Sequence, residues 1–464
     1  MSFLPSNHFQ PEGLSPQIKK VIAANSGKWL IGFALATIIC QLLLLFEQIA
    51  PFRFIVRMAS FGLSLLFLLF FVLQSSRTKP HPAQKISLIV FAILVLSFLH
   101  PETGSLPAGI VHFLLYVAIL APLFWVPKLG INMRVFRKLV FVLWGFHTLS
   151  SVFGILQIYF PERFESQLSL AIESRGEDYV QSLRYELASG KEIFRPMGLT
   201  DVPGGAATAG FYAVIFSFGF LLTSKRRYFK YLCITSMILG MTCVAFSQVR
   251  LIFVMTILFL LAYSLIFVGG GKLKKFFKVF LGSSIVMAIA ITWAVVVGGE
   301  NVKNRLLTLI EEKPTTVYYQ ERGFFLEDTI KTFMPRYPFG AGLARWGMIG
   351  YYFNVENDLY AEIQITGWLF DGGIPLIVVY SWMLVVTLGS ALKIIRKQFG
   401  PNRRELNVWA SLVVAYNLGV IVAVFNSNPF IGQTGLEFWF FNAALYAVSR
   451  PRYISFASPP RVQA

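Results

Sequence analysis

Long apolar runs, separated by short polar segments, follow one another along almost the whole chain. A helix needs roughly 17–25 residues to cross about 30 Å of hydrocarbon, and the runs fit this length, although the third is short. We expect spans near residues 29–48, 54–74, 86–99, 110–126, 139–160, 205–223, 231–248, 251–268, 279–297, 364–391, 406–425 and 434–449. The pattern predicts an all-α polytopic membrane protein with about 12 transmembrane helices, built as a single membrane domain over residues 1–464.

The composition agrees with a chain that keeps most of its surface in lipid. It is 56% hydrophobic and only 14% charged, with a mean hydropathy of +0.63, whereas about a quarter of the residues in a soluble domain are charged. The three cysteines, Cys40, Cys233 and Cys243, all lie inside apolar runs. They predict buried thiols rather than a disulfide framework or a metal site.

The basic residues separate cleanly when alternate loops are assigned to opposite sides of a membrane. The chain has 41 Lys and Arg against 23 Asp and Glu, a net charge of +18. Most of the basic residues fall at the two ends and in the loops near 77–85, 128–138, 225–230, 272–278 and 393–404. Short loops rich in Lys and Arg stay in the cytoplasm, so both termini are predicted to be cytoplasmic. Topology thus accounts for the basic charge, and no nucleic-acid partner is expected.

Two connections are long enough to build a site, and the same assignment places both outside the membrane. The first spans residues 161–204 and the second spans residues 298–363. The second is the main external (periplasmic) loop, and we expect it to cover an active site.

The second loop has a readable pattern. Residues 319–334 predict an amphipathic helix along the membrane surface, because Phe325, Ile330 and Phe333 fall on roughly one face. Pro335 ends this helix, and a glycine-rich turn follows at residues 339–343. A further short helix is expected to start near Asn357 and to lead into the tenth span.

Arg250 lies at the centre of a long apolar stretch. Residues 231–268 would be about 57 Å long as one helix, too long for one crossing, so the chain must turn near Ser247. The turn places Arg250 at the external end of two spans, where an arginine either snorkels to lipid headgroups or faces a ligand. Among the arginines of the two external loops are Arg195, Arg322, Arg336 and Arg345. Guanidinium forks bind phosphate oxygens, so the set favours a lipid-linked phosphate or diphosphate, although each alone fits a surface ion pair as well.

A short acidic segment precedes the tenth span. Read as a helix, Asp358 and Glu362 share a face and Glu356 lies at its start. A desolvated carboxylate there could accept a proton from a hydroxyl, but capping of a helix by acids explains the same pattern. The five histidines lie outside both long loops and lack metal-ligand spacing, so we expect neither a metal nor a cofactor.

Taken in order, segments between about residues 190 and 445 resemble the O-antigen ligase/polymerase family of bacterial envelopes, which includes Wzy-type polysaccharide polymerases. The resemblance is carried by Arg195-Pro196-Met197-Gly198-Leu199, Pro203-Gly204-Gly205, Ser247 and Arg250, Arg322, Pro338-Phe339-Gly340-Ala341-Gly342-Leu343, Asn357-Asp358-Leu359-Tyr360, Gly367, and Phe438-Trp439. The order of these elements and the matching topology are more specific than any single element.

The resemblance implies a metal-independent glycosyltransferase that moves a glycan from a polyprenyl diphosphate carrier to an acceptor hydroxyl. Arg250 and Arg322 would hold the diphosphate. Further substrate-binding residues would be Arg195, Arg336, Arg345, Asn357 and Asp358. Ligases of the family carry a catalytic histidine directly before the loop asparagine, where this chain has Glu356. We therefore expect Glu356 to be the base, and a polymerase rather than a ligase.

The resemblance also implies partners and leaves alternatives. The partners would be the polyprenyl-linked glycan, membrane lipids, a flippase and a chain-length regulator, all at the bacterial inner membrane. One alternative is an O-antigen ligase that passes finished glycan to lipid A core or protein. Another is a secondary transporter of a small anion or sugar, which would place ionisable residues near the middle of its spans. Here the charges gather at the external face, which favours an enzyme.

Overall fold

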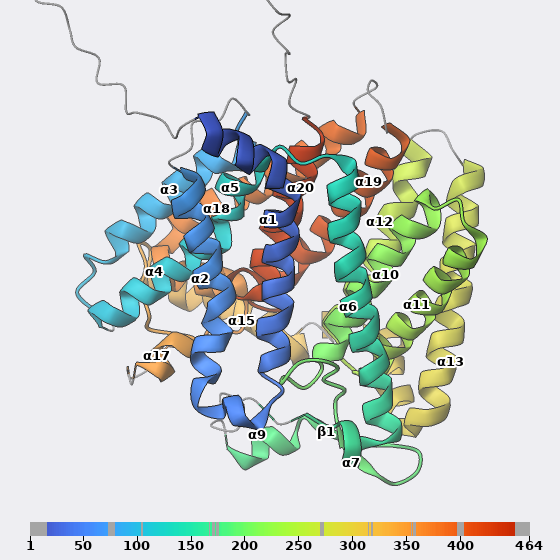
Figure 1. Cartoon of the computed structure of the whole chain (residues 1–464). Coiled ribbons are helices and arrows are strands. Elements are labelled where there is room, and N and C mark those ends of the chain that lie inside the picture. The colour runs from blue at the N-terminus through green and yellow to red at the C-terminus, as the bar shows by residue number, and fades with distance from the viewer. Residues whose placement is uncertain are drawn as a thin grey trace, which may run out of the picture.

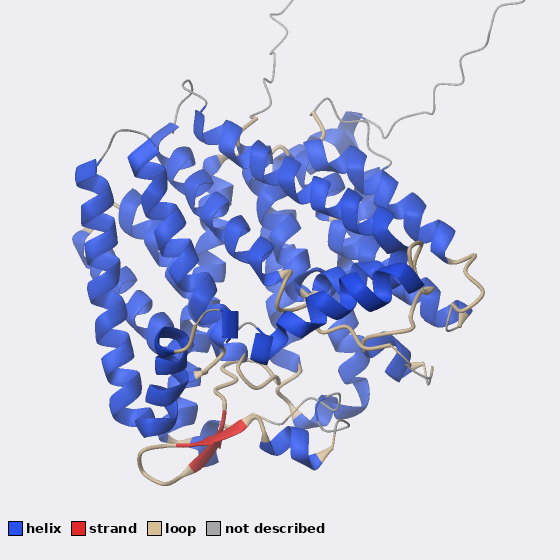
Figure 2. Ribbon diagram, turned by 180° about the vertical axis from the view of Figure 1, so that it is seen from behind, coloured by secondary structure: helices blue, strands red, loops and turns tan. Residues whose placement is uncertain are grey.

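The computed structural model describes residues 16–72, 79–103, 105–166, 168, 172, 176–269, 273–313, 315–316, 319–353, 355, 359–396 and 403–450. Within these residues the chain is mostly helical, and a single two-stranded hairpin is the only sheet (Figure 2). The predicted all-α class is therefore confirmed for the described part of the chain.

A helix overlaps each of the twelve predicted spans. The helices are α1 (Pro16–Leu43), α2 (Arg53–Val72), α3 (Pro82–Ser97), α4 (Leu106–Leu120) followed by α5 (Pro122–Leu129), α6 (Met133–Tyr159), α10 (Gly205–Thr223), α11 (Arg227–Phe246), α12 (Arg250–Gly269), α13 (Leu273–Glu311), α18 (Gln364–Arg396), α19 (Arg403–Ala423) and α20 (Gln433–Val448). Eight helical stretches of the described chain are long and apolar enough to cross a membrane. Shorter apolar stretches occur in α1, α3 and α12. These helices make the chain a multi-pass membrane protein.

The two ends of the helical bundle differ in what they carry (Figure 1). The start of α1 and the end of α20 lie at one end, which we call the basic end. The short elements of the first long loop lie at the opposite end, the loop end, whereas α15 of the second loop lies nearer the middle of the bundle in this view. In the first loop these are α7 (Pro161–Phe164), α9 (Glu177–Gln181), β1 (Arg184–Glu186) and β2 (Glu192–Phe194). In the second they are η2 (Tyr319–Gly323), α15 (Phe324–Asp328), η3 (Thr329–Phe333), α16 (Met334–Arg336) and α17 (Met348–Tyr352). The 3-10 helices η1 (Glu47–Phe52) and η4 (Pro429–Ile431) complete the elements.

The second loop differs in detail from its prediction. Residues 319–336 are helical, with π-helical turns in η2 and η3, so the predicted helix is confirmed. Its buried face is rotated, however, because Thr329 is buried against Thr366 (Oγ1 to Oγ1, 2.5 Å) while Ile330 is 52% exposed. The helix expected to start near Asn357 is wrong over its described part, because Leu359 to Ile363 are not helical and α18 begins at Gln364.

Glycines shape the bundle at two places. α13 bends at Gly299 (φ +65°) and continues to Glu311, well past the predicted end of its span. A Cβ at Gly299 would lie 2.9 Å from Ala188 Cα, so the bend seats the turn of the β-hairpin. α10 and α11 approach backbone to backbone at Gly210 and Gly240, where a Cβ on Gly240 would lie 2.7 Å from the Gly210 carbonyl oxygen.

Candidate functional site

The break in α18 receives the glycine-rich segment of the second loop. Gly373 has φ +69°, and a Cβ there would lie 2.5 Å from Phe339 Cα, so a side chain cannot fit. Two backbone hydrogen bonds hold the segment: Ala341 N donates to Phe370 O at 2.7 Å, and Ile374 N donates to Pro338 O at 2.9 Å. Residues 338–343 are thereby fixed against the start of α18.

Asp371, which directly precedes the break, is fully buried. Its Oδ2 accepts from Tyr116 OH at 2.6 Å, and its Oδ1 accepts from Trp346 Nε1 at 2.9 Å. His112 Nε2 lies 3.3 Å from Oδ2. A buried carboxylate is tolerated where donors surround it. Asp371 therefore joins α4, α18 and the second loop into one unit.

The first loop ends in a tight turn that α6 holds in place. The side-chain oxygen of Gln157 accepts from Met197 N and Gly198 N, both at 2.8 Å, and its Nε2 donates to Gly198 O at 3.0 Å. Gly198 has φ +65°, and a Cβ there would lie 2.6 Å from Ser150 Oγ. Only glycine fits this approach. The turn sets the position of Asp201, which follows it.

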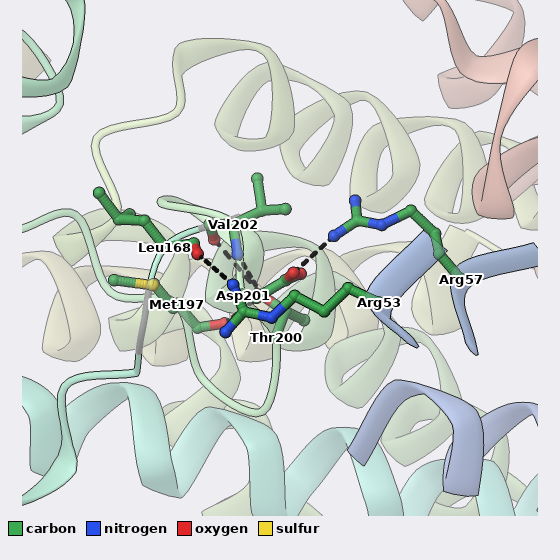
Figure 3. Close-up of polar contacts among 7 residues, drawn as sticks. All are labelled: Arg53, Arg57, Leu168, Met197, Thr200, Asp201 and Val202. Carbon is green, nitrogen blue, oxygen red and sulfur yellow. Dashed lines mark hydrogen bonds and ion pairs between the residues drawn. The ribbon is translucent and has the colours of Figure 1, made fainter. Parts of the chain in front are cut away.

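Two arginines reach from α2 into the first loop (Figure 3). Arg57 Nη2 pairs with Asp201 Oδ2 at 2.5 Å, and Arg53 Nη1 donates to Leu168 O at 2.8 Å. The side chain of Asp201 is 4% exposed, whereas that of Arg57 is 20% exposed. Because the Asp201 side chain is buried and the Arg57 side chain is partly exposed, Arg57 is the member of the pair that a ligand could reach.

A cavity of about 420 Å³ lies at the loop end, between α1, α2, α4, α6, α10 and α20. Arg57 and Asp201 form part of its lining, as do His112 and Trp346, which flank Asp371. Gly205 and neighbouring residues at the start of α10 also line the cavity. Most of the remaining lining is apolar, including Leu44, Phe61, Leu115 and Phe146. The size and lining are those of a small-molecule site, where a few polar groups fix the orientation of the ligand.

A second polar group lines the same cavity further along the helices. Tyr212 stacks on His147 with ring centroids 4.7 Å apart. Gln433 Nε2 donates to Glu437 Oε1 at 3.2 Å, and all four residues line the cavity. His147 lies near the middle of α6, so ionisable groups occur inside the bundle as well as at its loop end.

The structure places the two arginines expected to hold a diphosphate against different partners. Arg250 begins α12, and its Nη2 donates to Thr308 Oγ1 at 2.8 Å. The predicted helix break at Ser247 to Arg250 is thereby confirmed. Arg322 Nη1 pairs with Glu362 Oε2 at 3.0 Å and also donates to Asn426 O. Neither arginine is among the described residues that line the cavity.

The other expected substrate-binding arginines also contact neighbouring residues of the protein. Arg195 Nη2 donates to Ser182 O at 3.4 Å. Arg336 is exposed and lies over the ring of Tyr337, 5.2 Å from its centroid. Arg345 pairs with Glu102. The remaining expected site residues, Glu356, Asn357 and Asp358, lie outside the described residues.

Sequence reasoning missed the arginines of α2. Arg53 and Arg57 lie four residues apart at the start of an apolar run, at the end that the charge pattern assigns to the outside. They are basic residues on the side that the charge pattern leaves poor in Lys and Arg. Two such residues on one helix face could have indicated a binding site. Asp201 was missed because nothing in its local sequence shows that a distant helix supplies its partner.

The cavity therefore offers an arginine for anions, carboxylate and imidazole groups for protons, and apolar walls. Within the described ranges, no three His, Cys, Asp or Glu side chains gather to hold a metal ion. No protein-family model matches the chain, and no curated protein matches it. The function proposed below rests on the fold, the cavity and the sequence motifs.

Proposed function

We propose that the chain is a membrane glycosyltransferase, a polymerase that joins polyprenyl-diphosphate-linked oligosaccharide repeat units for a surface polysaccharide. The observation that carries the proposal is the cavity at the loop end, in which apolar walls meet the Arg57–Asp201 pair. Apolar walls beside one reachable guanidinium suit an amphiphile that bears phosphate, and a polyprenyl diphosphate is one.

The proposed topology has twelve crossings of the bacterial inner membrane, with the basic end in the cytoplasm and the loop end outside. The concentration of Lys and Arg near the basic end supports this orientation. The part of α18 that follows its break, Ile374 to Arg396, is about 34 Å long as helix and could cross alone. The buried first part of α18, from Gln364 to Asp371, would then lie near the external boundary of the membrane.

The reaction balances without a cofactor. The acceptor hydroxyl oxygen forms a bond to the anomeric carbon, and the bond from that carbon to the diphosphate oxygen breaks. The diphosphate leaves with the electron pair, and arginine stabilises the charge that develops on it. The hydroxyl proton passes to a base. We propose Glu356 for this role, with Arg250 and Arg322 as the diphosphate pair of the family resemblance and Arg57 as a further anion-binding residue.

One observation favours the transporter as a second candidate. Transporters use broken helices and ionisable residues deep in the membrane. The broken α18, and the cavity that extends to His147 and Glu437, have these features. An O-antigen ligase remains the alternative within the same reaction class.

The deciding experiment supplies purified protein in lipid nanodiscs with a polyprenyl-diphosphate-linked oligosaccharide. We expect a ladder of longer glycans and release of polyprenyl diphosphate, with activity that survives removal of divalent metal. A ligase would transfer glycan only after lipid A core or an acceptor protein is added. Intact donor in every arm, together with uptake of a sugar or anion into proteoliposomes, would overturn the proposal in favour of a transporter.

A further inference from the structure

A second concave site lies at the basic end, away from the cavity described above. It is a groove of about 640 Å³ between the first half of α6, the end of α10 and the start of α11. Three aromatic side chains line it, Phe141, Phe220 and Phe229, and their ring centroids lie 5.6 to 6.3 Å apart. The rings form a continuous apolar floor.

Cations surround this floor from two separate parts of the chain. The lining includes Arg137 and Lys138 from α6 and Lys225 and Arg226 from the turn between α10 and α11. Glu405 pairs with Arg137 and offsets that charge. Lys138, Lys225 and Arg226 are exposed, so the groove keeps a positive excess beside its aromatic floor.

Neighbouring aromatic residues indicate the depth of the groove in a membrane. Tyr228 and Tyr231 at the start of α11 are 64% and 68% exposed. Exposed tyrosines of membrane helices gather at the level of the lipid headgroups. Arg226 Nη1 donates to Tyr228 OH at 2.8 Å, which holds one cation of the groove at that level.

We propose that this groove binds an anionic phospholipid, with the phosphate against Lys138 and Lys225 and an acyl chain along the phenylalanine rings. A free phosphate would satisfy the lysines and leave uncovered the ring of Phe141, which is 48% exposed. A zwitterionic lipid would fill the floor but bring its own cation among the lysines. An anionic lipid satisfies both parts. The proposal rests on the multi-pass fold alone and stands whether or not the chain is a glycosyltransferase.

The test is native mass spectrometry of the full-length protein in detergent, titrated with phosphatidylglycerol or with phosphatidylcholine of the same acyl chains. The wild type should bind phosphatidylglycerol in preference to phosphatidylcholine. Each lysine near a lipid surface contributes about a five-fold change in affinity. Lys138→Gln with Lys225→Gln should therefore weaken phosphatidylglycerol binding about 25-fold and leave phosphatidylcholine binding unchanged.

The matched control is Lys274→Gln with Lys278→Gln. These two lysines are also exposed and lie at the start of α13, and the control removes the same charge outside the groove. It should keep wild-type affinity. Any of three outcomes overturns the proposal: unchanged affinity in the groove variant, an equal loss in the control, or displacement of the bound lipid by inorganic phosphate.

Discussion

The two long loops are docked onto the helical bundle by different chemistry. Side chains hold the first loop, through the amide of Gln157 and the Arg57–Asp201 pair. In the second loop, the glycine-rich segment is held backbone against backbone, where Gly373 lies against Phe339, and Trp346 adds a side-chain hydrogen bond to Asp371. The side-chain contacts place ionisable groups beside the cavity, whereas the backbone contact fixes the position of the chain and supplies no side-chain group. The comparison predicts that the Arg57–Asp201 pair of the first anchor binds ligand, and that the backbone contact at Gly373 contributes rigidity alone.

The largest expected effect comes from removing the guanidinium beside the cavity. Arg57→Ala should lower polymer formation about 10²–10³-fold, the usual cost of losing one group that stabilises developing negative charge. Lysine should rescue poorly, because it lacks the planar fork. The measurement is polymer formed per unit of membrane-inserted protein, and Arg163→Ala, which changes an exposed arginine of the first loop, is the control.

The same assay on Arg250→Ala and Arg322→Ala sharpens the comparison between the loops. If these arginines hold the diphosphate, both variants should match the loss in Arg57→Ala. If the second loop contributes shape alone, Arg322→Ala should lower the melting temperature, because it leaves Glu362 without its ion pair, and activity should follow folded protein. Normal polymer in all three variants would remove arginine from the mechanism.

The next effect concerns the anchor of the first loop. Gln157→Leu leaves the backbone N–H groups of Met197 and Gly198 without their acceptor. Each buried unsatisfied donor costs about 1–3 kcal/mol, so the variant with two such donors should lose about 2–6 kcal/mol of stability. A thermal melt in detergent measures the loss. Gln181→Leu, on an exposed residue of the same loop, should melt as wild type does, and equal melting of both variants would contradict the anchor.

A smaller effect is expected at the anchor of the second loop. Gly373→Ala adds a Cβ against the backbone of Phe339 at a positive φ, so it should cost about 1–3 kcal/mol in stability. Gly389 lies in the same helix with open space around it. Gly389→Ala should be neutral or slightly stabilising, because alanine favours helix. If the two variants melt alike, the second loop is not seated on the glycine break.

The smallest effect should come from the exposed ion pair of the first loop. A hydrogen bond from Lys191 lowers the pKa of the Glu162 carboxyl. A carboxyl whose pKa is lower in the folded state than in the unfolded state adds stability at pH values above its unfolded-state pKa. This stabilisation is lost as the pH falls through the folded-state pKa. Because both groups are exposed, solvent screens the pair, and Lys191→Ala should melt as wild type does at neutral and at acidic pH. A clear pH-dependent difference would show that the hairpin depends on charge.

The arrangement of helices along the chain was predictable because lipid demands long apolar runs and leaves few alternatives. The predicted end of α13 was too early. The glycine pair at 298–299 indicates a loop in the sequence, but the positive φ of Gly299 lets the helix bend there and continue. The buried face of the helix at residues 319–336 was also predicted incorrectly, because it depends on a distant contact. Thr329 is buried because Thr366 satisfies its hydroxyl, and local periodicity cannot show such a partner.

The candidate site was less predictable, because its residues come from distant parts of the chain. Arg57 and Asp201 are separated by more than a hundred residues, and α6 determines where the turn before Asp201 lies. The sequence pattern favoured arginines within the two long loops as the ligand-binding residues. The guanidinium that lines the cavity belongs instead to Arg57, near the start of α2, where an exception to the charge pattern was the signal.

The contact between Gly210 and Gly240 has a practical consequence for following the protein at work. Two helices that touch through their main chains have no rotamers to rearrange, so α10 and α11 should keep their mutual distance when a ligand enters the cavity. Spin labels on the lipid-facing sides of these two helices would therefore give a fixed internal ruler. Movement of any other element could be measured against it.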